Sequence, residues 1–188
     1  MCKLKPSEFG AVMSAAVVSM TMATRTHAPQ SSRFALGQKP TQNQIAALNV
    51  TVFPDGTGLP FGRGNAIDGR GVYAARCATC HGPAGEGTAD YPQLVGGRGT
   101  LKTDRPILTV GSYWPYATTI WDYVHRAMPY DLPGSLTSNE MYAVTAHLLF
   151  LNGIIREDEL LNQNTLPRVR MPNRNGFVRD ARPDVKPR

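Results

Sequence analysis

Apolar residues recur at the three- to four-residue spacing of amphipathic helices in three stretches of the chain, and no stretch alternates as a strand would. The spacing predicts a first helix over 68–77, a second that begins near Ser112 and Pro115 and a third that follows Thr137. The candidate inward residues are Val72, Tyr73 and Ala75; Ile120, Val124 and Ala127; and Met141, Val144, Leu148 and Leu151. The pattern therefore predicts an all-α domain.

Helix-boundary signals support the same segments. Pro115 suits the first turn of the second helix, where a missing N–H costs nothing. Thr137 and Glu140 have the spacing of a capping box, and Gly153 is suited to end the third helix. A further short helix is predicted over 41–48.

Composition divides the chain into four parts. Residues 1–23 have a basic start and a mostly apolar run, the layout of a signal peptide, with cleavage after residue 23 or as late as Ala28. Residues 24–63 are rich in Gly, Pro, Asn and Thr and are expected to wrap over the core. Residues 64–156 form the helical domain, and residues 157–188 form a basic, proline-containing tail.

The leader and the tail set expectations about compartment and partners. A membrane span needs about twenty apolar residues, and the leader run is shorter and contains Ser and Thr, so we expect a periplasmic protein without a membrane span in its mature form. From Arg168 onward the tail carries +5 of the chain's net charge of +6. The tail is either a solvated terminus or an arm that lies on an acidic partner. Nucleic acid is not an expected partner of an exported chain.

The strongest chemical signal is Cys77-Ala78-Thr79-Cys80-His81. C-x-x-C-H is the attachment sequence of c-type haem, in which two thiols bond to the porphyrin and the histidine binds the iron. A zinc site would need a second Cys/His pair, and a thioredoxin-like pair would need a βαβ context; the sequence contains neither. The motif occurs once, so we expect one covalent haem c.

The sixth ligand of the iron is predicted to be Met128, which follows the second helix and precedes a proline. Met141 fits a core role on the third helix, and Met171 lies in the tail, away from the helices. His125 and His147 are competing ligands, and a vacant site is the other alternative. The choice matters because a thioether raises the reduction potential of the iron whereas a second imidazole lowers it.

Other residues are candidates for the haem environment. The second ring nitrogen of His81 needs an acceptor, and the carbonyl of Pro92 is the candidate. The candidates for the haem propionates are Arg98, Tyr113, Trp114 and Tyr116. No residue is predicted to be catalytic.

The C-x-x-C-H motif, Pro92-x-Leu94, Ala127-Met128-Pro129 and the capped last helix together resemble the class I c-type cytochromes. The resemblance covers about residues 64–153 and implies three main helices around one covalent haem, with extended N-terminal and C-terminal segments. It implies that Cys77 and Cys80 hold the haem, that His81 and Met128 are axial ligands, and that the first and last helices cross near Gly69 or Gly71.

A narrower resemblance covers most of the exported chain. The segments 53–60, 110–119 and 166–173 are similar to the SoxD-type haem subunit of a molybdenum sulfane or sulfite dehydrogenase. Such subunits often carry a second haem domain, and the single C-x-x-C-H motif of this sequence leads us to expect one haem domain here. The resemblance implies that single electrons pass from a molybdenum catalytic subunit to this chain and on to a soluble cytochrome c. The alternatives are a free-standing shuttle cytochrome and a haem enzyme such as a thiosulfate dehydrogenase.

Overall fold

The computed structural model describes residues 36–178. Residues up to Lys39 belong to one unit and the chain from Pro40 onward to a second, which carries every helix and strand of the described residues. The predicted leader lies outside the described residues. No helix among residues 36–178 is long and apolar enough to cross a membrane.

The elements are mostly helical, as predicted. In chain order they are α1 (Gln42–Leu48), β1 (Arg63–Gly64), α2 (Ala66–Arg76), α3 (Ala78–His81), the 3₁₀ helix η1 (Thr100–Lys102), α4 (Ala117–Ala127), α5 (Ser138–Leu151), β2 (Leu161–Asn162) and the 3₁₀ helix η2 (Leu166–Arg168). The strands β1 and β2 form a short antiparallel pair in which Gly64 faces Leu161. Two residues per strand are too few to give a sequence pattern, so this pair was not predicted.

The helix boundaries follow from local chemistry. The Thr137–Glu140 capping box of α5 is present, and Gly153 has the positive φ (62°) of a helix terminator, so both predictions are confirmed. The start of α4 differs from the prediction. Tyr116 has extended dihedrals and serves as its N-cap, so Pro115 precedes the helix and does not lie in its first turn.

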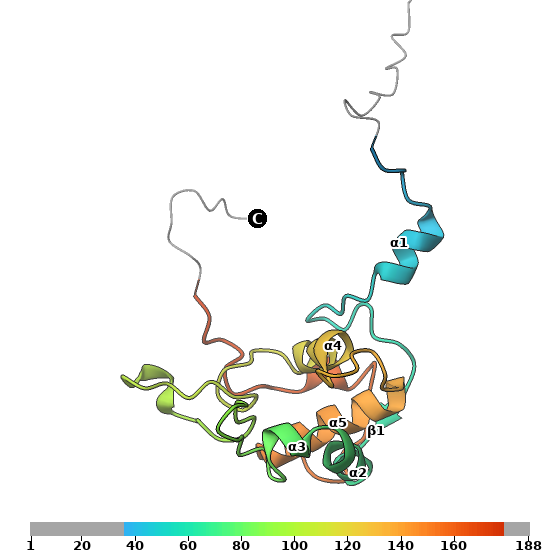
Figure 1. Ribbon diagram of the computed structural model, residues 1–188. Helices are drawn as coiled ribbons and strands as arrows, with labels where there is room; N and C mark the ends of the chain where they lie inside the picture. Colours follow the sequence, from blue (N-terminus) through green and yellow to red (C-terminus); the bar gives the residue numbers. More distant parts are fainter. Residues whose placement is uncertain (1–35, 179–188) are drawn as a thin grey trace, which may run out of the picture. The chain divides into compact units, whose positions relative to one another are not determined.

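Helices α2 and α5 cross at a glycine (Figure 1). A Cβ on Gly69 would lie 1.9 Å from the carbonyl oxygen of Ala143, whereas a Cβ on Gly71 would meet nothing within 4 Å. The resemblance left the crossing at either glycine, and the structure assigns it to Gly69. The side chain of Tyr73 is fully buried one turn further along α2.

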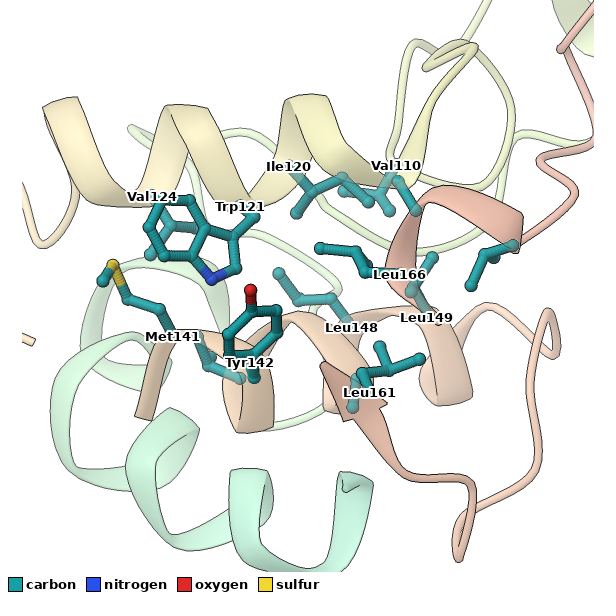
Figure 2. Packing of buried hydrophobic residues seen from close by; sticks show 14 of the residues in the cluster. Val110, Ile120, Trp121, Val124, Met141, Tyr142, Leu148, Leu149, Leu161 and Leu166 are labelled. Carbon is teal, nitrogen blue, oxygen red and sulfur yellow. The ribbon is translucent and has the colours of Figure 1, made fainter. Parts of the chain in front are cut away.

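The hydrophobic core lies between α4 and α5 and continues under the C-terminal segment (Figure 2). Trp121 of α4 and Tyr142 of α5 pack ring against ring, with centroids 5.8 Å apart. Leu161 and Leu166, from beyond α5, are fully buried at the other end of the same cluster. The core therefore needs residues outside the three main helices.

Residues 166–178 pack against the domain. Leu166, Val169 and Met171 are all buried, and the last of these is only 3% exposed. The expectation that Met171 lies away from the helices is therefore wrong. Val169 and Met171 are flanked by Arg and Pro, so these two buried apolar residues form no periodic pattern in the sequence.

Residues 52–60, before α2, also contact the core. Val52 is buried, and its N–H donates to the Asp122 carboxylate on α4 at 2.9 Å. The hydroxyl of Tyr142 donates to the carbonyl of Pro60 at 2.9 Å. These two bonds tie residues 52–60 to α4 and α5.

Candidate haem site

The C-x-x-C-H segment consists of Cys77, which joins α2 to α3, and the one-turn helix α3 itself. Helix α2 ends at Arg76, and Cys77 is the N-cap of α3. The N–H groups of Cys80 and His81 both donate to the carbonyl of Cys77, at 3.2 and 3.0 Å. Both thiols are free and half-buried, and burial raises the pKa of Cys77 to about 11.

The orientation of His81 is fixed by a backbone carbonyl. Its Nδ1 lies 2.8 Å from the carbonyl oxygen of Pro92, which can only accept, so Nδ1 carries the proton. The lone pair of Nε2 is then left for a metal ion. The predicted acceptor for this histidine is therefore present.

Two further hydrogen bonds hold the loop after His81. The hydroxyl of Tyr73, buried in α2, donates to the carbonyl of Gly82 at 2.8 Å. The N–H of Leu94 donates to the carbonyl of Gly85 at 2.7 Å, which closes the loop beside Pro92. The packed α2–α5 crossing thus sets the position of the histidine.

Met128 lies immediately after α4 and is its C-cap. Its backbone is extended, its N–H donates to the carbonyl of Val124 at 3.0 Å, and its side chain is half-buried against the core. The competitor His125 packs on Trp121 at 5.1 Å between ring centroids. The other competitor, His147, is buried against Tyr73 at 5.3 Å, beside the α2–α5 crossing.

The residues around the motif fit a haem. Several hydrophobic side chains pack against the core cluster but stay only partly buried, and Cys77, Leu94, Trp114 and Met128 are among them. Partly covered apolar side chains, two free thiols and an oriented imidazole suit a largely apolar macrocycle that bonds to both sulfurs. A disulfide between the two cysteines is not formed in the described structure.

The four candidate propionate residues all have contacts within the protein. Arg98 donates to the carbonyl of Asn152 at 2.7 Å, and Trp114 meets Tyr123 edge to face at 5.6 Å. Tyr113 packs edge to face with Phe177 at 5.2 Å, and the Arg174 guanidinium lies 4.8 Å from the centre of the Tyr116 ring. Their role beside the haem stays a prediction.

Sequence reasoning missed Asn152, the C-cap of α5. Its amide accepts from the N–H of Gly96 at 3.2 Å and donates to the carbonyl of Leu94 at 3.1 Å. It therefore joins the end of α5 to the loop that follows Pro92. The only signal in the sequence is an Asn next to the helix-ending Gly153, which does not reveal a partner 58 positions away.

Comparisons with known proteins agree with this geometry. The family model for cytochrome c matches residues 66–152. In the crystal structure of the sulfane dehydrogenase SoxCD from Paracoccus pantotrophus, a chain is 41% identical, with a TM-score of 0.73 over 79% of this chain and 73% of that chain. Residues 66–152 are less than half of this chain, so the likeness to that structure extends into the flanking segments. No curated protein matches.

Proposed function

The chain belongs to the cytochrome c family and has the class I fold, and we propose that it is the electron-transfer subunit of a periplasmic, molybdenum-containing sulfane or sulfite dehydrogenase. The family implies one covalently bound haem c. When bound, haem c supplies a one-electron Fe(III)/Fe(II) couple.

The residues of the chain have separate roles in this proposal. Cys77 and Cys80 would hold the haem covalently, and His81, oriented by the carbonyl of Pro92, would bind its iron through Nε2. Met128, at the end of α4, would supply the second protein ligand of the iron. With two protein ligands, the haem would supply electron transfer and not substrate chemistry at the metal.

One observation carries the choice of partner. The likeness to a chain of the SoxCD structure includes segments that the general cytochrome c model does not match. Likeness in these flanking segments, at 41% identity, supports a subunit of the same kind of complex. A molybdenum catalytic subunit would then oxidise the sulfur compound, and a soluble cytochrome c would accept the electrons.

The proposal is tested by isolating the protein from native periplasm. We expect a molybdenum-containing subunit to co-elute with it, and we expect a sulfane or sulfite substrate to reduce the haem of that complex. A sample of the cytochrome alone is the control, and its haem should stay oxidised with the same substrate. Elution as a single chain, with no reduction in the presence of the other periplasmic proteins, would overturn the proposal in favour of a shuttle.

A further inference from the structure

The C-terminal segment alternates between buried anchors and exposed arginines. Leu166, Val169 and Met171 point into the core, and Arg168 and Arg170 lie between them and are exposed. Arg168 ends the 3₁₀ helix η2 and is exposed, and the backbone is extended from Val169, where successive side chains point to opposite sides, so the buried Val169 and Met171 direct Arg170 outward. The two guanidinium groups are therefore held on the outer side of an anchored segment.

The next residues extend the same surface towards Tyr113 and Tyr116. The side-chain amide of Asn173 donates to the carbonyl of Tyr113 at 2.6 Å, which anchors this part of the segment. Arg174 lies over the Tyr116 ring in cation–π geometry. Phe177 packs against Tyr113, yet 53% of its surface remains exposed.

The charged side chains of the segment itself are all of one sign. No Asp or Glu occurs between Leu160 and Val178. The ion pairs found among residues 36–178 involve Arg70, Arg126 and Arg156, and none of them involves an arginine of this segment. Solvated surface arginines are common, but these three sit on a backbone that the core has already ordered.

We propose that Arg168, Arg170, Arg174 and Phe177, here called the arginine face, dock an acidic surface of the molybdenum catalytic subunit; this rests on the function proposed above. Arginine and aromatic residues are enriched where proteins bind one another. An anchored backbone also lowers the entropy lost on binding. The arginine face lies outside residues 66–152, so the general cytochrome c fold does not require it.

The test is a pair of charge reversals with equal change in net charge. Arg168→Glu with Arg170→Glu alters the arginine face, and Lys102→Glu with Arg105→Glu alters two cations that are also exposed, in and after η1. The affinity of each haem-loaded variant for the purified catalytic subunit is measured over a range of salt concentrations. We expect the first pair to weaken binding about tenfold or more and to flatten its salt dependence, and the control pair to change affinity by less than about threefold.

The controls separate docking by the arginine face from loss of folding and from attraction by net charge. Unchanged thermal unfolding and visible spectrum are expected for both variants, because none of the four side chains is buried. Equal loss of affinity in the two pairs would show attraction by net charge alone and overturn the arginine face, as would full affinity of the first pair. A failure of the unaltered protein to bind the catalytic subunit would instead overturn the proposed function, and the arginine face with it.

Discussion

At the scale of single residues, the proposed ligand Met128 can be separated from other methionines by spectroscopy. Met128→Ala is expected to lose the near-infrared sulfur-to-iron charge-transfer band of the ferric protein. Met141→Leu is the matched control, because Met141 is 3% exposed in the core on α5 and its replacement conserves volume. The reduction potential of Met128→Ala is expected to fall, since the thioether stabilises Fe(II). A band that survives in Met128→Ala would assign the ligand elsewhere.

Gly69 and Gly71 give a second residue-scale prediction. A methyl group on Gly69 would overlap the backbone of Ala143, so Gly69→Ala must push α2 and α5 apart and is expected to lower the free energy of unfolding by about 3 kcal/mol. Gly71→Ala has open space and is expected to raise it by roughly 0.5–1 kcal/mol through helix propensity. Urea unfolding of the haem-loaded proteins measures both. Similar effects in the two variants would contradict the assigned crossing.

His147 makes the stability of the fold sensitive to pH. Burial lowers its pKa, and Arg70 acts in the same direction, whereas a hydrogen bond with the backbone of Ala66 and the charge of Glu157 oppose the shift. The fold therefore favours the neutral ring, and the unfolded chain binds a proton that the folded chain resists as the pH falls below about 6.5. The contribution of neutral His147 to the free energy of unfolding is present above about pH 6.5 and is lost as the pH falls below that value.

The measurement compares unfolding free energies at about pH 7.5 and about pH 5. His147→Phe keeps an aromatic ring against Tyr73 but cannot take up a proton. We expect the variant to lose less stability than the parent between these two pH values. An equal loss in both proteins would show that other groups cause the acid sensitivity.

At the scale of elements, the capping box of α5 is expected to stabilise the longest helix. Thr137→Ala removes the acceptor for the N–H of Glu140 and should cost about 1 kcal/mol, whereas Thr137→Ser keeps the hydroxyl and should cost much less. Thermal unfolding measures both. Equal losses of stability in Thr137→Ala and Thr137→Ser would mean that the hydroxyl does not cap the helix.

Hydrogen bonds from Thr137, first from its backbone N–H, lower the pKa of Glu140. The contribution of this carboxylate to stability is therefore present at neutral pH and lost as the pH falls below about 4.5.

The elements also show what the sequence could predict. Periodicity and caps were enough to place α2, α4 and α5, but the prediction that Ala75 faces inward on α2 is wrong, because Ala75 is exposed and α2 buries Ala66, Gly69 and Tyr73. The C-x-x-C-H motif was readable because its chemistry lies within five neighbouring residues. The roles of Asn152, Val169 and Met171 could not be predicted, because their partners are distant in sequence and their neighbours are polar or charged.

At the scale of the whole molecule, the flanking segments complete the core of the helical domain. Val52 packs from the N-terminal side, and Leu161, Leu166, Val169 and Met171 pack from the C-terminal side. The chain retains only two cysteines beyond the predicted leader, and both are expected to hold the haem, so no disulfide would contribute to stability. A small domain buries little apolar surface, so each buried side chain contributes a large share of its stability. The flanking segments therefore combine a structural role with the proposed docking role.

Two truncations separate these roles. Deletion of 167–188 removes the buried side chains Val169 and Met171, and burying an apolar side chain contributes about 1.5–3 kcal/mol, so the free energy of unfolding should fall by on the order of 4 kcal/mol. Deletion of 179–188 keeps both anchors and the arginine face. It is expected to leave the denaturant midpoint and the affinity for the catalytic subunit near those of the full chain. Should the longer deletion prove as stable as the shorter one, the C-terminal segment would be an appendage and the arginine face would lose its fixed backbone.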